Sequence, residues 1–338
     1  MRVETYSSAD GQGITERWRA ITVADVGEFG VVERLTARFA AGVEQPPAVL
    51  LGPGDDAAVL ATPDGRVVAT TDLLVDSRHF RRDWSAPDDV GRKAAAQNLA
   101  DVAAMGAVPT GLLVGLAVPP DLPVDWLEGV ADGMRIECAK VGATVLGGDV
   151  VRGETLTLAV TALGDLQGRA PVTRSGARPG DVVAVTGRLG WAAAGLAVLG
   201  RGFRSPVSVV AAHRRPEPPY AEGPRAAELG ASAMVDVSDG LVADLQHVAL
   251  ASNVGIELDT SRLDVPAKLR DVGGALGVDP MSWVLAGGDD HALAATFPGA
   301  TPPPSPWQII GRVARGRGVL VDGSAYEGPS GWDHFRVT

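Results

Sequence analysis

Cysteine is almost absent from this 338-residue chain, in which Cys138 stands alone. A single thiol can form neither an intrachain disulfide nor a zinc site with several thiolate ligands. Aromatic residues are also scarce, at 5% of the chain. Extended runs of apolar residues are missing as well. The longest spans 105–120, is interrupted by Pro109, Thr110 and glycines, and falls short of the roughly 20 residues that cross a bilayer.

Further absences narrow the function. The N-terminus has no apolar core of the signal-peptide kind, so we expect a cytoplasmic protein without membrane segments. The formal net charge is −11, and no stripe of Lys and Arg suggests a nucleic-acid partner. The sequence contains no G-x-x-x-x-G-K-[ST] loop, no G-x-G-x-x-G fingerprint and no protein-kinase signature set. Any nucleotide must therefore bind through another architecture.

What is present indicates two domains of mixed secondary structure. Gly (43 residues) and Pro (24 residues) are abundant, which favours many short elements joined by tight turns. A segment rich in Gly, Pro and Arg at 168–179 has the composition of a domain boundary. We expect a mobile N-terminal extension (1–26), an N-terminal domain (27–167) and a C-terminal domain (168–338). Because strands and helices alternate in both halves, the predicted class is α/β (α+β).

Individual helices and strands are predicted from apolar runs and from the Gly, Pro and Asp residues that separate them. An amphipathic helix is expected where Phe29, Val32, Leu35 and Phe39 recur at helical spacing. Further helices are predicted at 88–105, 126–141, 191–199, 221–229 and 241–252. Strands are predicted at 49–51, 57–60, 67–71, 112–118, 144–146, 156–164, 181–186, 233–237 and 255–258.

Aspartates beside glycines mark the expected ends of several of these elements. The motifs are Gly54-Asp55-Asp56, Thr70-Thr71-Asp72, Gly147-Gly148-Asp149, Asp236-Val237-Ser238-Asp239-Gly240 and Gly287-Gly288-Asp289-Asp290, with Asp101 on a predicted helix. Any one of them could be an ordinary turn or helix cap. Taken together they suggest gathered carboxylates, which need cations to offset their repulsion, and oxygen ligands suit Mg²⁺.

Glycines and a helix start complete this hypothesis. Backbone N–H groups beside glycine can approach phosphate oxygens closely. Ser238 precedes a predicted helix, where backbone donors and the helix dipole favour an anion. The pattern therefore predicts a nucleoside-triphosphate site that uses several metal ions.

At these residues the sequence resembles the thiamine-monophosphate kinases, a family within the aminoimidazole ribonucleotide synthetase-like superfamily. The resemblance extends from about residue 27 to 335 and rests on GDDAAVL (54–60), TTDLLVDSRHF (70–80), KAAAQNLADVAAMGA (93–107), GGDVVRG (147–153), TRSGARPGD (173–181), DVSDGL (236–241), GGDD (287–290) and GWDHF (331–335). It implies a two-domain fold of mixed sheets flanked by helices, whose N-terminal halves pair in a homodimer. It further implies direct transfer of the ATP γ-phosphoryl group to thiamine monophosphate, which gives thiamine diphosphate and ADP.

The resemblance also implies roles for individual residues. Catalytic roles fall to Asp72, Asp149 and Asp239. The substrate contacts would be His79, Asp289 and Trp332. Nucleotide contacts would come from Gly148, Asp149, Arg174 and Ser238. The Mg²⁺ ligands would be Asp56, Thr70, Thr71, Asp72, Asp101, Asp149, Asp236 and Asp239. The chain departs from the family at Asp289-Asp290-His291, where the family usually has Glu, Asp and Tyr.

The chemistry agrees with the residue types. A phosphate monoester is already anionic near neutral pH, so catalysis depends on alignment and charge neutralisation and needs no strong general base. Two alternatives stay open at this point: another ATP-dependent enzyme of the same superfamily, such as an aminoimidazole ribonucleotide synthetase, and a non-catalytic nucleotide-binding protein. Cys138 and His213 carry no site pattern and are predicted to be structural.

Overall fold

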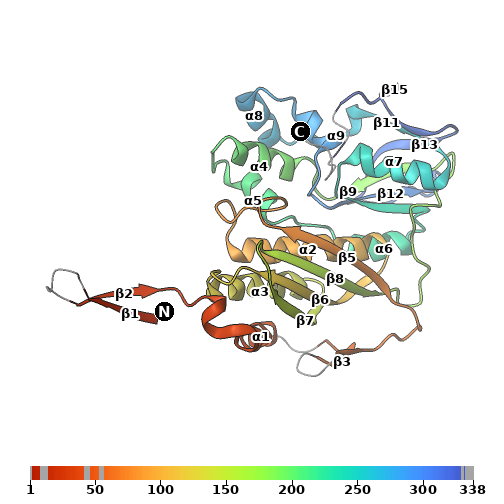
Figure 1. Ribbon diagram of the computed structural model, residues 1–338. Coiled ribbons are helices and arrows are strands. Elements are labelled where there is room, and N and C mark those ends of the chain that lie inside the picture. The colour runs from red at the N-terminus through yellow and green to blue at the C-terminus, as the bar shows by residue number, and fades with distance from the viewer. Residues whose placement is uncertain (1, 8–13, 42–45, 53–56, 329–330, 332–338) are drawn as a thin grey trace.

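The computed structural model describes residues 2–7, 14–41, 46–52, 57–328 and 331. These residues form two bodies, each with its own sheet and apolar core, and Figure 1 shows one lying above the other. Two of the predicted site residues, Asp56 and Trp332, lie outside the described residues. None of the helices in the described part of the chain is long and apolar enough to span a bilayer.

The first body is built on a four-stranded mixed sheet in the order β5-β8-β6-β7. Its strands are β5 (Val68–Val75), β6 (Val108–Val118), β7 (Thr144–Arg152) and β8 (Thr157–Asp165). The β6–β7 pair is parallel and the other pairs are antiparallel. Residues of β8 alternate between buried and half-buried, which is typical of a sheet with one face on a core.

Helices α2 (Pro87–Ala104) and α3 (Val124–Ala139) pack against one face of this sheet. The other face carries large apolar side chains in the open, among them Leu73 (57% exposed), Leu113 (39%) and Val151 (52%). A cavity of 810 Å³ lies over it, between the strands and α1. The described residues of a single copy therefore leave one face of the first sheet largely uncovered.

Helix α1 (Val23–Ala40) packs against α3 and β7. Its contact line runs through Val31, Leu35 and Phe39 at four-residue spacing, whereas Phe29 is 85% exposed. The predicted apolar stripe was therefore wrong at its beginning. Before it come β1 (Arg2–Ser7) and β2 (Ile14–Arg19), an antiparallel pair that extends from the body in Figure 1 and that the sequence pattern did not predict. Strands β3 (Val49–Leu51) and β4 (Val59–Leu60) form a separate pair.

The second body contains a seven-stranded mixed sheet in the order β10-β12-β9-β13-β11-β14-β15. Only the β11–β14 pair is parallel within the described sheet. Its strands are β9 (Val182–Thr186), β10 (Ala233–Val237), β11 (Gly255–Leu258), β12 (Ala292–Phe297), β13 (Gln308–Ala314), β14 (Gly318–Val321) and β15 (Ser324–Ala325). Its helices are α4 (Trp191–Gly200), α5 (Val207–Arg214), α6 (Glu222–Glu228), α7 (Leu241–Ser252), α8 (Ala267–Leu276) and α9 (Pro280–Ala286), with a 3₁₀ turn at Thr260–Arg262.

Two strands end well beyond the predicted residues. Strands β5 and β7 continue past Asp72 and Asp149, so both aspartates lie inside strands. The motif from Gly287, before which no element was predicted, follows helix α9. Because Asp is depleted in strands, the sequence predicts a strand end at Asp72 and at Asp149. Here the two aspartates occupy half-buried and exposed strand positions, where a carboxylate can remain hydrated or bind a ligand.

Helix α2 lies between the two bodies. It covers the first sheet and also contacts β10, α5 and α6 of the second body. Ala104, in its last turn, belongs to an apolar cluster with Phe297 and Trp307. One face of α2 is therefore in position to build a site between the bodies.

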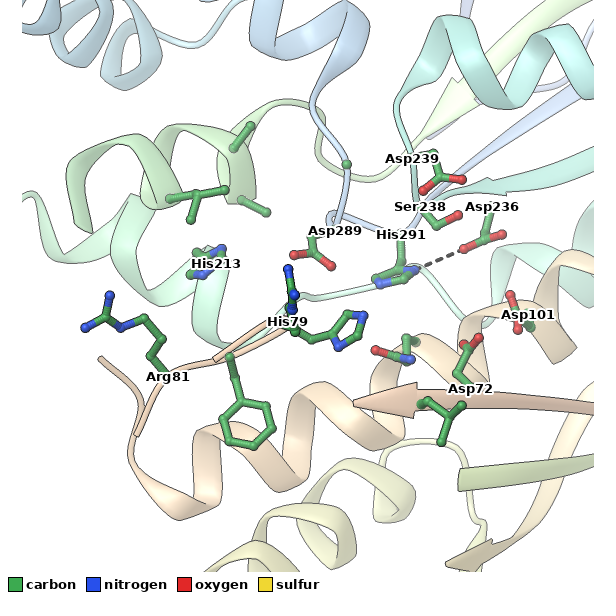
Figure 2. A pocket seen from close by; sticks show the side chains of 18 of the residues that line it. Asp72, His79, Arg81, Asp101, His213, Asp236, Ser238, Asp239, Asp289 and His291 are labelled. Carbon is green, nitrogen blue, oxygen red and sulfur yellow. Dashed lines mark hydrogen bonds and ion pairs between the residues drawn. The ribbon is translucent and has the colours of Figure 1, made fainter. Parts of the chain in front are cut away.

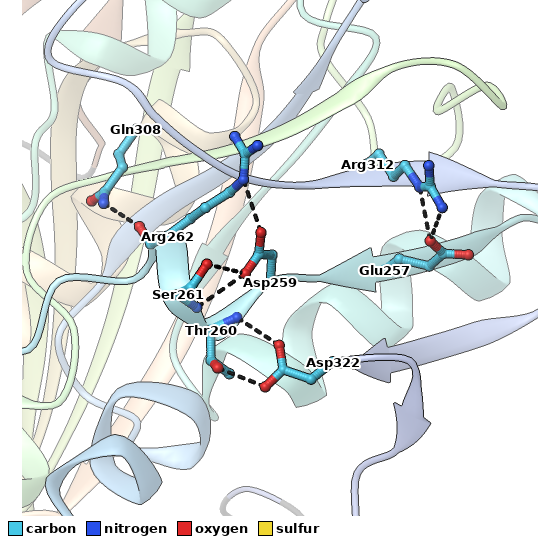
Figure 3. A network of polar contacts seen from close by, with 8 residues as sticks. All are labelled: Glu257, Asp259, Thr260, Ser261, Arg262, Gln308, Arg312 and Asp322. Atoms are coloured by element: carbon cyan, nitrogen blue, oxygen red, sulfur yellow. Dashed lines mark hydrogen bonds and ion pairs between the residues drawn. The ribbon is translucent and has the colours of Figure 1, made fainter.

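A separate group of aspartates stabilises the turn after β11, far along the chain from this helix. Asp259 accepts hydrogen bonds from Ser261 and Arg262, and Asp322 accepts from the backbone and hydroxyl of Thr260 (Figure 3). These carboxylates already accept hydrogen bonds from neighbouring donors, and exposed pairs of this kind contribute little to stability. They are structural turn residues.

Candidate active site between the two bodies

A cavity of 630 Å³ opens where the two bodies meet. The first body contributes Asp72 from β5, Asp101 from α2 and the segment after β5 that contains His79. The second body contributes the segment after β10, the segment between α9 and β12, and the first turn of α4. Figure 2 shows these side chains directed toward one space from both bodies. Neither body forms the cavity alone.

Carboxylates gather at one end of the cavity. Asp72 and Asp101 approach it from the first body, and Asp236 and Asp239 from the second (Figure 2). Burial, and then the negative charges of Asp236 and Asp72, raise the pKa of Asp101 to about 7. The Thr70 hydroxyl donates a hydrogen bond of 2.8 Å to Asp101, which partly offsets this repulsion. Part of the predicted acidic cluster therefore forms in three dimensions.

The end of β10 and the segment before β12 are held together by their backbones. Asp289 donates its N–H to the Ser238 carbonyl (2.9 Å), and His291 donates its N–H to Val237 (3.0 Å). Gly288 packs so tightly here that a Cβ atom on it would lie 2.1 Å from the Ser238 oxygen. Only glycine allows this approach. The two motifs, about 50 positions apart in sequence, thus form a single structural unit.

His291, one of the departures from the family pattern, is buried in this unit. Its Nδ1 lies 3.0 Å from Oδ2 of Asp236. Burial lowers the pKa of the imidazole, but the hydrogen bond and the charge of Asp236 outweigh burial and raise it above its ordinary value. The raised pKa favours the protonated imidazole beside Asp236, a predicted metal ligand, at a position where the family usually has an aromatic ring.

Asp244 is a supporting residue that the sequence pattern did not reveal. It lies in the first turn of α7 and accepts hydrogen bonds of 3.0 Å from the N–H groups of Asp239 and Gly240. Burial, followed by the charges of Asp236 and Asp239, raises its pKa to about 7. It holds the segment that presents Ser238 and Asp239. Its spacing from Gly240 is that of a helix N-terminus, which is the only signal the sequence offers.

The other end of the cavity carries aromatic and apolar side chains together with the guanidinium of Arg81 (Figure 2). Its lining includes Phe80, Trp84, Ala193, Leu196 and His213. Burial lowers the pKa of His213 to about 3, so the ring is neutral at physiological pH. Among the described residues its Nδ1 has no hydrogen-bond partner. His213 was predicted to be structural, since neither its spacing nor its neighbours in sequence carry a site motif.

His79 and Asp289 lie between the two ends (Figure 2). His79 Nδ1 accepts a hydrogen bond of 3.0 Å from the Val75 N–H, so a neutral ring carries its proton on Nε2. Burial raises the pKa of Asp289, but the charge and hydrogen bond of Lys93 at 2.8 Å, together with the charges of His213 and His291, outweigh burial and lower the pKa to about 2. The predicted pair of substrate contacts thus consists of a fixed imidazole and an ionised carboxylate.

Asp290, the other acidic residue of the motif, has a different environment. It is 4% exposed, and its Oδ1 accepts a hydrogen bond of 2.9 Å from the Ala192 N–H at the start of α4. Burial raises its pKa to about 7. Asp290 therefore fixes α4, whose first turn lines the cavity, while Asp289 faces the cavity itself.

Several predicted site residues are spread more widely. Arg174 and Ser238 line the cavity. Thr71 lies on β5 and its hydroxyl donates to the Val160 carbonyl (3.1 Å). Gly148 and Asp149 lie on β7, three strands across the sheet from Asp72, or about 14 Å at the usual strand spacing. One copy of the chain therefore does not bring Asp149 to the carboxylates of the cavity.

The donor set fits Mg²⁺ better than a transition metal. The carboxylates of the cavity, the Ser238 hydroxyl and the nearby Thr70 hydroxyl offer oxygen ligands. A cation would relieve the repulsion by Asp236 and Asp72, which adds to burial in raising the pKa of Asp101. Within the described residues, no three His, Cys, Asp or Glu side chains are placed to share one ion. Mg²⁺ does not need such a cage, because one or two carboxylates suffice when phosphates and water complete its shell.

Comparison with known protein families identifies the class of protein to which the chain belongs. Residues 54–166 match the AIR synthase related protein N-terminal domain, and residues 178–283 match the corresponding C-terminal domain. The chain thus has the two-domain architecture of the AIR synthase-related proteins, with mixed sheets and flanking helices, as the sequence predicted.

Individual relatives narrow the class further. The thiamine-monophosphate kinase of Mycobacterium tuberculosis is 49% identical over 93% of this chain and 93% of its own length. The Corynebacterium glutamicum enzyme is 39% identical over 93% and 95%. A solved structure described as AaThiL complexed with AMPPCP and TMP superposes with a TM-score of 0.76 at 32% identity, over 94% of this chain and all (100%) of that one. The chain belongs to the thiamine-monophosphate kinase family, which confirms the predicted family and the predicted class of ATP-dependent kinase.

Proposed function

We propose that this protein transfers the γ-phosphoryl group of ATP to thiamine monophosphate in the cytoplasm, giving thiamine diphosphate and ADP. One observation carries the proposal: a single cavity joins an acidic end, suited to metal-bound phosphates, to an aromatic end, suited to a ring system. The M. tuberculosis relative and the complex with an ATP analogue and TMP support it.

The residues that line the cavity take their proposed roles from their places in it, and the family resemblance adds the others. Asp72, Asp101, Asp236 and Asp239 would hold Mg²⁺ ions together with Thr70, Thr71 and the predicted Asp56. When bound, Mg²⁺ would neutralise phosphate charge and align the reacting groups. Ser238, just before α7, and Arg174 are in position to bind nucleotide phosphates. His79 and Asp289, with the predicted Trp332, would bind thiamine monophosphate.

The transfer itself balances without a general base. A phosphate oxygen of thiamine monophosphate attacks the γ-phosphorus, the new P–O bond forms, and the bond to the β–γ bridging oxygen breaks to release ADP. The acceptor oxygen is already deprotonated near neutral pH, so no side chain has to remove a proton. The described residues act by holding the two substrates in line and by excluding water between the bodies.

The distance between Asp149 and the cavity bears on the assembly. We propose that two copies pair through the open faces of their first sheets, covering Leu73, Leu113 and Val151, and that Gly148 and Asp149 serve the cavity of the partner copy. Both edge strands of the sheet, β5 and β7, carry predicted ligands. In such a pair an edge strand of one copy can approach the opposite edge strand of the other.

The domains are proposed to be 27–167 and 168–338, after the N-terminal extension 1–26.

The activity test uses purified protein with ATP, Mg²⁺ and thiamine monophosphate, and separates the products by chromatography. We expect thiamine diphosphate and ADP in equal amounts. Asp72→Asn should reduce turnover at least about a hundredfold with a native circular-dichroism spectrum, while Asp121→Asn, an exposed control, should not. ATP consumption without diphosphate formation, or product only from formylglycinamidine ribonucleotide, would contradict the assignment.

Mixing variants tests the shared site. If Asp72 and Asp149 come from different copies, an Asp72→Asn protein mixed with an Asp149→Asn protein regains part of the lost activity, because half of the sites in a mixed pair are intact. If both residues serve the same copy's site, the intact partners never meet in one cavity and the mixture stays inactive.

A further inference from the structure

Lys93 is a buried ammonium group that no predicted role includes. It lies on α2, is 2% exposed, and does not line the cavity. Four and eight residues further along the same helix are Gln97 and Asp101, which do line it. This spacing places the three side chains on one face of α2, directed toward the second body.

The contacts of Lys93 connect three segments of the cavity wall. Its Nζ donates to Oδ2 of Asp289 (2.8 Å), to the carbonyl of His79 (3.2 Å) and to the carbonyl of His213 (3.4 Å). An ammonium group has three donors, so these acceptors satisfy it completely. The acceptors belong to the segment after β5, the end of α5 and the segment before β12. All three acceptor residues line the cavity.

The backbone at Asp289 adds to this picture. Its φ is +67°, in the left-handed region that residues other than glycine rarely adopt. Two described interactions hold it there: the N–H to Ser238 bond and the Lys93 pair. Without the ammonium, the Asp289 carboxylate would lose the hydrogen bond that holds it toward α2. The carbonyls of His79 and His213 would also lose the donor that they share.

We propose that Lys93 is a positioning residue for the phosphate acceptor. It acts through His79 and Asp289, setting the distance between the two proposed substrate contacts across the boundary of the two bodies. This inference rests on the proposed function, because it takes His79 and Asp289 as the residues that bind thiamine monophosphate. Nucleotide binding, at the other end of the cavity, does not depend on it.

Kinetics of Lys93→Met test the inference. We expect the KM for thiamine monophosphate to rise about tenfold to a hundredfold, as for a lost charge-assisted hydrogen bond, with the KM for ATP changed less than about threefold. Lys93→Arg keeps the charge but its planar fork cannot serve the same three acceptors, so an intermediate KM is expected. This second variant gives the answer if Lys93→Met does not fold.

A matched control separates positioning from general stabilisation. Arg215, after α5, pairs at 3.1 Å with the buried Asp89 of α2, so it also connects the two bodies, but neither residue lines the cavity. Arg215→Met should lower the melting temperature without changing the KM for thiamine monophosphate. An equal rise in that KM for Arg215→Met and Lys93→Met would overturn the proposal, as would an unchanged KM in both Lys93 variants.

The Asp289→Asn variant distinguishes the inference from the proposed function. If Asp289→Asn alone leaves the KM for thiamine monophosphate unchanged, the assignment of the substrate contact fails. If Asp289→Asn raises that KM and Lys93→Met does not, only the role of Lys93 fails. In the double variant we expect the effects not to add, because both single changes break the same pair.

Discussion

Replacing Asp101 with Asn should stabilise the protein in the absence of metal while removing its activity. Asp101 is mostly buried beside Asp72 and Asp236, and its pKa is raised from 3.8 to about 7. Asn has the same shape and can still accept the hydrogen bond from the Thr70 hydroxyl. The substitution therefore removes a repelled charge and leaves the packing intact.

The expected size follows from linkage between protonation and folding. Because the folded pKa lies above the unfolded value, the group's contribution to stability falls as pH rises from about 4 to about 7. Each pKa unit corresponds to about 1.4 kcal/mol, which gives an upper bound of about 4 kcal/mol above pH 7. Relaxation of the neighbouring charges and solvent at the cavity reduce this to about 1–3 kcal/mol.

Thermal melts in EDTA provide the measurement. At pH 8 the variant should melt roughly 2–10 °C above the parent protein, and the difference should shrink as the pH approaches 4. Asp121→Asn, which removes an exposed carboxylate, serves as the control for net charge. A lower melting temperature at pH 8, or a gain that does not depend on pH, would refute the reasoning. With Mg²⁺ and ATP present, the parent should gain more stability than the variant.

Two other substitutions and one chemical modification have clear expected outcomes. Gly288→Ala would place a Cβ atom 2.1 Å from the Ser238 oxygen, so kcat/KM should fall at least about tenfold with a native circular-dichroism spectrum; normal kinetics would contradict the close packing. Leu113→Glu, on the open sheet face, should yield a monomer in light scattering with little turnover, and an unchanged mass would argue against pairing there. Burial, with the charge of Glu137, raises the pKa of Cys138 to about 12, so a disulfide reagent at pH 8 should modify it only after unfolding.

The sequence predicted the second body's central elements closely. Strands β10 and β11 and helix α7 begin and end where the apolar runs and glycines of 233–258 indicated. In those segments local propensity and burial agree. They disagree in β5 and β7, where Asp72 and Asp149 occupy strand interiors that a single sequence presents as turns.

The site was predictable as a set of residue types but not as a geometry. The motifs located Asp72, Asp101, Asp236, Asp239 and Asp289, all of which reach the same cavity. Residues that support the cavity from outside its lining, or that reach it only through packing, carry no sequence motif. Asp244 holds a turn through two backbone bonds, and His213 enters the cavity only because α5 packs against α4. Long-range packing decides such roles, and no short pattern encodes it.

Because the cavity lies where the two bodies meet, its position has a consequence for engineering and for natural variation. A substitution in α2 or in the boundary segment 168–179 can change the catalytic constants without altering a predicted metal ligand. The reason is that a small rotation between the two bodies separates Asp101 from Asp236. Chimeras that join the front half of one homologue to the back half of another should therefore fold as intact halves yet work poorly, until the contacts along α2 are matched as well. The catalytic constants therefore depend on the fit between the two halves as well as on the residues that line the cavity.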